Sequence, residues 1–149
     1  MNATFQAKRF ILAGVGAALL ALAGCAEMKS MVNSGHMVNV QLSGAEEVPP
    51  VSTAARGAGS IKIEADKTVS GSVTTTGVTG VAAHIHTGAR GQNGPISVGM
   101  VKTSENVWSI PAGARLTDAQ YDAFKAGNLY VNVHSAQHKG GEIRGQLRP

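Results

Sequence analysis

The sequence predicts an all-β fold, a Greek-key β-sandwich or barrel of about seven or eight strands with one short helix near residues 118–126. Apolar and polar residues alternate with period two in several short segments, which is typical of strands with one buried face. The chain contains 19 glycines, many of them between these segments, where they permit tight turns. A single segment carries helix-capping residues followed by helical spacing.

The first 24 residues form a separate segment that resembles a bacterial signal peptide. Lys8 and Arg9 give it a positive start, and the apolar run that follows is shorter than the roughly 20 residues of a membrane-spanning helix. The run ends in Leu-Ala-Gly-Cys, which resembles a lipobox, and Cys25 is the only cysteine of the chain. We therefore expect residues 1–24 to be removed and Cys25 to carry lipid, including palmitate.

Lipid on Cys25 predicts where the protein resides. Acyl chains contribute about 0.8 kcal/mol per buried CH₂ group, so two or three of them make a stable membrane anchor. Residues 25–36 are then a flexible tether, and residues 37–149 are the folded domain. We expect an exported domain that faces the periplasm or the cell surface, with the outer membrane favoured in a Gram-negative cell because Ala26 is not aspartate.

The exported part of the chain carries little net charge. Removing Lys8 and Arg9 from the 13 basic residues leaves 11 against 9 acidic residues, a net charge of +2. There is also no basic run and no basic helix face, so we expect no nucleic-acid partner. Because no cysteine follows residue 25, the domain relies on its core, or on its core and a bound ion, rather than on disulfides.

The first half of the domain is predicted to be strands. Val38–Leu42 alternates clearly, and the two prolines within residues 44–51 predict a loop there. A second strand around Ile61–Ile63 is followed by a turn at Asp66-Lys67. Residues 69–76 are rich in β-branched side chains, so we expect them to pair with the second strand as a hairpin.

The alternation continues in the second half, where it separates histidines from apolar residues. Ala83 and Ile85 share one face of a strand, and His84 and His86 share the opposite face. The other predicted elements are a glycine-rich loop at residues 88–94 and strands at residues 96–101, 129–134 and 143–147.

One helix interrupts the strands. Thr117 and Gln120 have the spacing of a capping box, in which each side chain bonds the other residue's backbone N–H. Leu116 and Tyr121 flank this box as a hydrophobic staple, and Gly127 supplies the stop. The helix therefore has a defined beginning and end.

Four segments, in chain order, resemble the CHRD (chordin-type) domain family: Leu42–Val51, Ala83–Ile96 with its His-Ile-His-Thr-Gly sequence, Leu116–Gln120, and Gly127–Leu147 with its Leu-Tyr-Val-Asn-Val-His sequence. The resemblance covers residues 37–148. It implies a β-sandwich-like fold and an exported protein, and it implies no general catalytic activity.

The histidines are the candidate functional group. His84 and His86 lie about 6.6 Å apart along one strand face, and imidazoles at that spacing can converge on one ion. His134 lies on the polar face of its own strand and is a candidate third ligand, with His138 as a possible fourth or a gate. Neutral imidazole suits Zn(II) or Cu(II), which are the expected cofactors if the site binds metal. The alternative is that these histidines only hydrogen-bond the neighbouring glycine-rich turns.

Two further sets of charged residues have weaker signals. Glu142 and Arg144 share a strand face, where they can form an ion pair, with each other or across strands, or orient a histidine. Glu46 and Glu47 supply one pair of carboxylates, which is too few for a calcium site.

These residues support three classes of function. We expect first a non-enzymatic binding module for an envelope protein or polymer, and as an alternative a Cu(II)- or Zn(II)-binding envelope protein. An enzyme is disfavoured because Ser135 directly follows His134, so the two side chains point to opposite faces of a strand.

Overall fold

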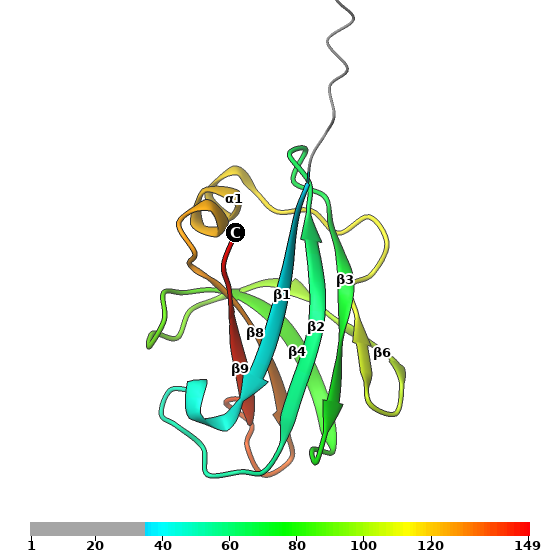
Figure 1. Ribbon diagram of the computed structural model, residues 1–149, viewed down its shortest axis with the longest axis vertical. Coiled ribbons are helices and arrows are strands. Elements are labelled where there is room, and N and C mark those ends of the chain that lie inside the picture. The colour runs from blue at the N-terminus through cyan, green and yellow to red at the C-terminus, as the bar shows by residue number, and fades with distance from the viewer. Residues whose placement is uncertain (1–34) are drawn as a thin grey trace, which may run out of the picture. The chain divides into compact units, whose positions relative to one another are not determined.

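A computed structural model describes residues 35–149, which form nine antiparallel strands in one nearly closed, barrel-like sheet (Figure 1). The strands are β1 (His36–Ser43), β2 (Arg56–Ile63), β3 (Val69–Thr76), β4 (Gly80–Thr87), β5 (Ile96–Gly99), β6 (Val101–Ser104), β7 (Val107–Ser109), β8 (Leu129–Ser135) and β9 (Ile143–Leu147). The other elements are a 3₁₀ turn, η1 (Gly44–Glu46), and the helix α1 (Asp118–Lys125).

Several predictions concern residues outside this range. The signal peptide (1–24), the lipidated Cys25 and nearly all of the tether lie outside the described residues. The strand β1 begins at His36, the last residue assigned to the tether. Between residues 35 and 149, no helix is long and apolar enough to cross a membrane.

The all-β prediction with one helix is confirmed, but the expected number of strands was too low. The strand β7 is only three residues long and was not predicted. The single strand expected at residues 96–101 is divided at Met100 into β5 and β6, because β5 pairs with β4 whereas β6 pairs with β7. Alternation along the sequence continues across this point and does not reveal that the chain changes partners.

The order of strands in the sheet is β5-β4-β8-β9-β1-β2-β3-β7-β6. The first strand therefore lies in the middle of the sheet, between the last strand β9 and its hairpin partner β2. Ser43 of β1 pairs with Arg144 of β9, and β2 pairs with β3 over its full length, as the predicted hairpin requires. The two ends of the sheet, β5 and β6, are consecutive in the chain.

The inner face of the sheet forms the hydrophobic core. Val38, Val40 and Leu42 of β1 are all buried, which confirms the predicted alternation in this strand. The same face of β4 and β8 contributes Ile85 and Val131, both 0 % exposed. The apolar face predicted for each of these strands is thus the face that packs inside the barrel.

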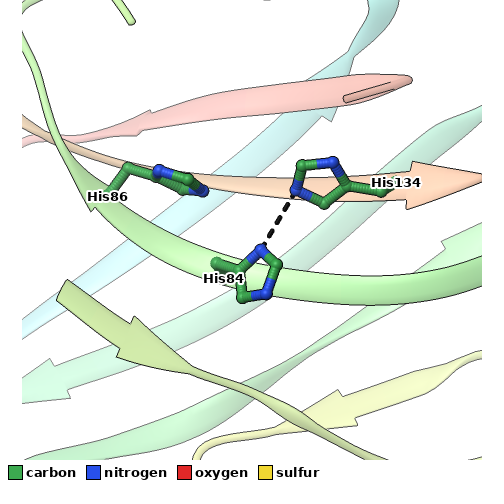
Figure 2. Close-up of side chains that lie close together, drawn as sticks. All are labelled: His84, His86 and His134. Atoms are coloured by element: carbon green, nitrogen blue, oxygen red, sulfur yellow. Dashed lines mark hydrogen bonds between the residues drawn. The ribbon is translucent and has the colours of Figure 1, made fainter. Parts of the chain in front are cut away.

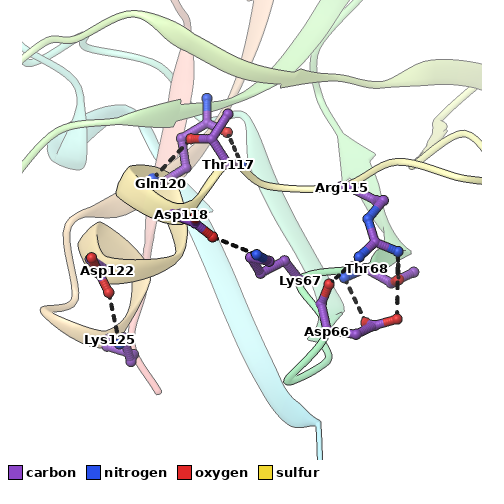
Figure 3. A network of polar contacts seen from close by, with 9 residues as sticks. All are labelled: Asp66, Lys67, Thr68, Arg115, Thr117, Asp118, Gln120, Asp122 and Lys125. Atoms are coloured by element: carbon purple, nitrogen blue, oxygen red, sulfur yellow. Dashed lines mark hydrogen bonds and ion pairs between the residues drawn. The ribbon is translucent and has the colours of Figure 1, made fainter.

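The helix α1 lies at one end of the barrel, close to the C terminus (Figure 1). The capping box is present: the Thr117 hydroxyl accepts the Gln120 N–H at 3.2 Å, and Gln120 Oε1 accepts the Thr117 N–H at 2.8 Å (Figure 3). An ion pair between Lys67 and Asp118 joins the start of the helix to the turn between β2 and β3 (Figure 3). Phe124, fully buried, anchors the helix on the core.

The strands β4, β8 and β9 also have a covered outer face. Tyr130, Asn132 and Arg144 lie on that face and are 1–2 % exposed. Two loops cover them, one between β1 and β2 and one between β4 and β5. Asn93 of the second loop donates to the carbonyl of Val48 in the first at 2.8 Å, so the loops also contact each other. Polar side chains are therefore enclosed between the sheet and its loops, and this is where the predicted site lies.

Candidate metal centre

The structure brings His84, His86 and His134 together on the outer face of β4 and β8 (Figure 2). The two strands are paired so that His134 lies opposite Ala82, two residue pairs along the strands from His84, which lies opposite Asn132. Each histidine offers a ring nitrogen, and these three nitrogens lie within 4.8 Å of one another. The structure confirms that the three side chains lie on one face of the sheet, as the alternation of residues predicted.

Backbone carbonyls orient two of the three rings. His86 Nδ1 donates to the Gly94 carbonyl at 2.9 Å, and His134 Nδ1 donates to the Lys139 carbonyl at 2.8 Å. A carbonyl oxygen only accepts, so Nδ1 carries the proton in both rings and Nε2 keeps a lone pair. This is the arrangement in which metal-binding histidines are usually held.

The third ring completes the group through a hydrogen bond. His84 Nδ1 lies 3.1 Å from His134 Nε2 (Figure 2). Because Nε2 of His134 has the lone pair, His84 Nδ1 is the donor. A cation between the two rings would take the place of that proton.

His86 Nε2 stands out among the ring nitrogens. The residue is 8 % exposed, and this nitrogen forms no hydrogen bond within the part of the chain that the structure describes, although the Asn132 amide, whose Oδ1 is also unpaired there, lies beside the ring. Buried polar atoms are nearly always paired, so an unpaired one needs an explanation.

The electrostatics favour neutral histidines. Burial lowers the pKa of His84 below the ordinary value of 6.5, and the neighbouring His134 and His86 lower it further. Burial also lowers the pKa of His86, although the hydrogen bond to Gly94 opposes this. Both rings are therefore neutral at pH 7, which is the form that binds metal.

Arg144 helps to position His86 through the Tyr130 ring, which lies against both side chains. The Tyr130 ring stacks on the His86 ring with centroids 5.0 Å apart and planes 5° apart, and the Arg144 guanidinium lies 3.4 Å from the Tyr130 centroid. Arg144 also donates to the Ala89 carbonyl at 3.0 Å. It therefore holds the loop whose Gly94 carbonyl orients His86.

The other two predicted residues do not join the group. Glu142 accepts a hydrogen bond from Thr53 at 2.9 Å, and within residues 35–149 it forms no ion pair with Arg144. His138 is not among the three clustered histidines. Its backbone instead closes the turn after β8, where its N–H donates to the Ser135 hydroxyl at 3.2 Å.

Sequence reasoning missed two polar residues beside the centre, Glu47 and Asn132. Glu47 is 4 % exposed, and its pKa rises from 4.5 to about 7, mainly through burial, although the Arg144 charge opposes this rise. The Asn132 side chain lies next to both Glu47 and His86. A side chain at Gly141 would collide with the Glu47 carboxylate, so this glycine permits the close packing. Alternation placed Asn132 on the correct face, but no sequence pattern indicated that a loop carboxylate covers it.

An open pocket of about 490 Å³ lies in front of the three histidines. Its lining includes Val81 and Ile96, which are 60 % and 55 % exposed, and Lys139 is the one lysine, arginine or carboxylate residue in that lining. The group is therefore accessible from solvent through an opening with apolar edges.

Comparison with known proteins identifies the family. No curated protein and no solved structure matches the chain. A family model described as CHRD domain matches residues 38–147, which include the three histidines, Arg144 and Glu47. This match extends from β1 to the end of β9, so the chain belongs to the CHRD domain family.

Proposed function

We propose that this CHRD domain is a binding protein of the bacterial envelope that holds one Cu(II) or Zn(II) ion through His84, His86 and His134. One observation carries the proposal: ring nitrogens of His84, His86 and His134 lie within 4.8 Å of one another, and His86 Nε2 is buried without a hydrogen-bond partner within residues 35–149. An ion between the rings would give that nitrogen its missing partner. Imidazole binds both Cu(II) and Zn(II) well.

The spacing of the rings fits this ligand chemistry. Nitrogens bound tetrahedrally to zinc at about 2.0–2.1 Å lie roughly 3.3 Å from one another. His84 Nδ1 and His134 Nε2 are 3.1 Å apart, close to that separation. Three imidazoles leave one tetrahedral position free, and the pocket in front of the histidines gives an external ligand access to it.

Binding is a better proposal than catalysis for the same residues. Ser135, which directly follows His134, is 1 % exposed and accepts the His138 N–H. A serine nucleophile needs a base within hydrogen-bonding distance and access to substrate. The Ser135 side chain is on the opposite strand face from His134, so that histidine is not placed to act as its base.

The location in the envelope is part of the proposal and rests on the signal segment and Cys25. Cys25→Ser should move the protein from the membrane fraction to the soluble fraction and abolish labelling with radioactive palmitate. Lys8→Gln is the control, since it leaves the lipid attachment residue in place. Equal membrane association of wild type and Cys25→Ser would contradict lipid anchoring.

Calorimetry tests the metal proposal directly. The purified protein should bind about one equivalent of Zn(II) or Cu(II), and its melting temperature should rise with metal concentration. The double variant His84→Ala/His86→Ala should lose both effects while keeping a native circular dichroism spectrum. His138→Ala is the matched control and should bind metal as the wild type does.

Two results would refute the metal proposal. In one, neither ion gives heat or a thermal shift with wild-type protein. In the other, the double variant binds metal as tightly as the wild type, which would place the ion elsewhere. A loss of stability in the double variant with no metal binding by either protein would support the alternative, in which the histidines only hold the glycine-rich turns.

A further inference from the structure

A second, larger pocket lies away from the histidines. Its volume is about 580 Å³, and it is a groove over the outer face of β9, β1 and β2. Three arginines line it, each from a different part of the chain: Arg56 begins β2, Arg90 is in the loop after β4, and Arg148 follows β9. None of the three clustered histidines contributes to this lining.

The groove has an uncompensated positive charge. Its one acidic residue is Glu46, and Arg90 binds that carboxylate through two hydrogen bonds of 2.5 and 3.1 Å. Among the residues that the structure describes, Arg56 donates only to neutral backbone carbonyls, those of Thr53 and Ala55. Arg148 has no ion pair with any residue between 35 and 149. Two cations in one groove are thus without an acidic partner.

The hydrogen bonds to backbone carbonyls also fix the orientation of the Arg56 guanidinium. Both of them, at 3.2 and 2.7 Å, use the same nitrogen, Nη1. The guanidinium is therefore held in one orientation while its other N–H groups remain available. A planar, oriented guanidinium is suited to bind a carboxylate with two hydrogen bonds.

The floor of the groove has a different chemistry from its walls. It is formed by outward-facing side chains of β1, Asn39, Gln41 and Ser43. Asn39 Oδ1 accepts from Ser60 at 2.6 Å, which leaves its NH₂ group to donate. The amide of Gln41 and the hydroxyl of Ser43 can both donate and accept. A ligand that matches this floor needs groups that also do both, and hydroxyl groups meet that need.

We propose that this groove binds an acidic glycan, a chain of sugars with carboxylate groups. The carboxylates would bind Arg56 and Arg148, and the sugar hydroxyls would bind the amide and hydroxyl floor. Free phosphate could bind an arginine but fills only a small part of a groove of about 580 Å³. An acidic peptide could bind both arginines but would meet Gln41 and Ser43 with backbone amides instead of a series of hydroxyl groups. The groove is open to solvent and not enclosed, so a ligand longer than the groove can extend out of it.

The lining predicts how such a ligand binds. No aromatic residue is among those that line the groove, so sugar stacking does not contribute. Binding therefore depends on ion pairs and hydrogen bonds at the surface, and added salt should weaken it strongly.

Titration with a hexamer of galacturonic acid at about 20 mM salt tests the proposal. Wild-type protein should bind it, and binding should weaken at least about tenfold at about 300 mM salt. The double variant Arg56→Gln/Arg148→Gln should lose at least about tenfold in affinity, since each arginine supplies a charge-assisted contact. Arg115→Gln, at an exposed arginine outside the groove, is the matched control and should bind normally.

Three other ligands decide between the possible interpretations. A neutral glucose hexamer, a glutamate hexapeptide and inorganic phosphate should each bind at least about tenfold more weakly than the acidic hexamer. Equal binding of the peptide or phosphate would overturn the glycan assignment in favour of a general anion site. Absence of binding by the acidic hexamer, or an unchanged affinity in the double arginine variant, would overturn the groove proposal entirely.

This inference does not depend on the metal proposal. All titrations are carried out with EDTA, because carboxylated sugars bind divalent cations themselves. The variant His84→Ala/His86→Ala should bind the acidic hexamer as the wild type does. Loss of glycan binding in that variant, with a native fold, would contradict the assignment to a separate groove.

Discussion

The strands β1 and β8 belong to one sheet but are buried in different ways. In β1, buried residues alternate with exposed ones, because only the inner face is covered. In β8, every residue except His134 is buried, because the core covers one face and two loops cover the other. The half of the sheet that contains β8 thus has a second, polar interior.

The polar interior holds the groups with the most unusual environments. Within residues 35–149, Arg144 and Glu47 are among the few charged side chains that are buried, and His86 lies beside them. A buried polar residue is more informative than an exposed apolar one, since burial without pairing is costly. The comparison indicates that the β8 half encloses the candidate metal centre, whereas the outer face of β1 is open and lines the groove with the arginines.

Replacing Arg144 should have the largest effect on stability. Arg144→Ala would remove the stack on Tyr130 and leave the Ala89 carbonyl and the Glu47 carboxylate without this cation, at a cost of about 3–5 kcal/mol. Arg115→Ala removes an exposed arginine and should cost less than about 1 kcal/mol. Urea unfolding measures both. Similar losses for the two variants would mean that the polar interior is no more important than the surface.

Glu47 should give the polar interior a distinctive pH dependence. Its native pKa, about 7, is above the ordinary value of 4.5, so its favourable contribution is complete below pH 4.5 and is lost as pH rises through 7. Glu47→Gln stays neutral and should exceed wild type by about 2–3 kcal/mol at pH 8, with little difference near pH 4. Unfolding at both pH values measures the change. A wild type as stable as the variant at pH 8 would show that Glu47 ionises without penalty.

Zn(II) binding should weaken as pH falls, whereas the contribution of Glu47 to stability is lost as pH rises. The pKa of His84 and that of His86 lie below 6.5, so at that pH the neutral form of each ring still predominates. Zn(II) affinity should therefore change little between pH 8 and 6.5 and then fall, by up to about tenfold per pH unit for each ligand that takes up a proton. Calorimetry across this range checks the profile. A steep fall above pH 6.5 would contradict neutral, buried ligands.

The smallest effect on stability is expected for a substitution on the exposed outer face of the half of the sheet that contains β1 and β3. Thr74 of β3 is exposed, and its hydroxyl has no hydrogen-bond partner within residues 35–149. Thr74→Val keeps the β-branched shape and should change stability by no more than about 0.5 kcal/mol. Thermal unfolding is sufficient to detect this. A loss of about 2 kcal/mol would show that both outer faces of the sheet are structurally important.

The sequence predicted the features that depend on local pattern. Period two identified the buried face of β1 and placed His84 and His86 on one face. The Thr117 capping box set the first residue of α1, whose last residue, Lys125, is one position before the expected end. These features depend on residues that are close in sequence, so a pattern can reveal them.

The features that were missed depend on distant contacts. Alternation showed that Tyr130 and Asn132 share a face with His134, but it could not show that loops bury that face. Glu47 lies in the loop that was predicted from two prolines, and those prolines do not indicate that its side chain is buried. Its burial depends on contacts with Arg144 and Gly141, which are about a hundred residues later in the chain. The division of the strand at Met100 likewise depends on which partner each side finds.

The position of Met100 between the two edge strands has a consequence for self-association of the protein. The two edges of the sheet, β5 and β6, are both supplied by residues 96–104, and Met100 between them is 8 % exposed. If this one segment were to detach, β4 and β7 would lose their edge partners in the same event. The eight-residue strand β4 would then replace the four-residue β5 as an edge of the sheet, and long unpaired edges nucleate intermolecular sheets. Burial of Met100 thus helps to keep both short edge strands in place.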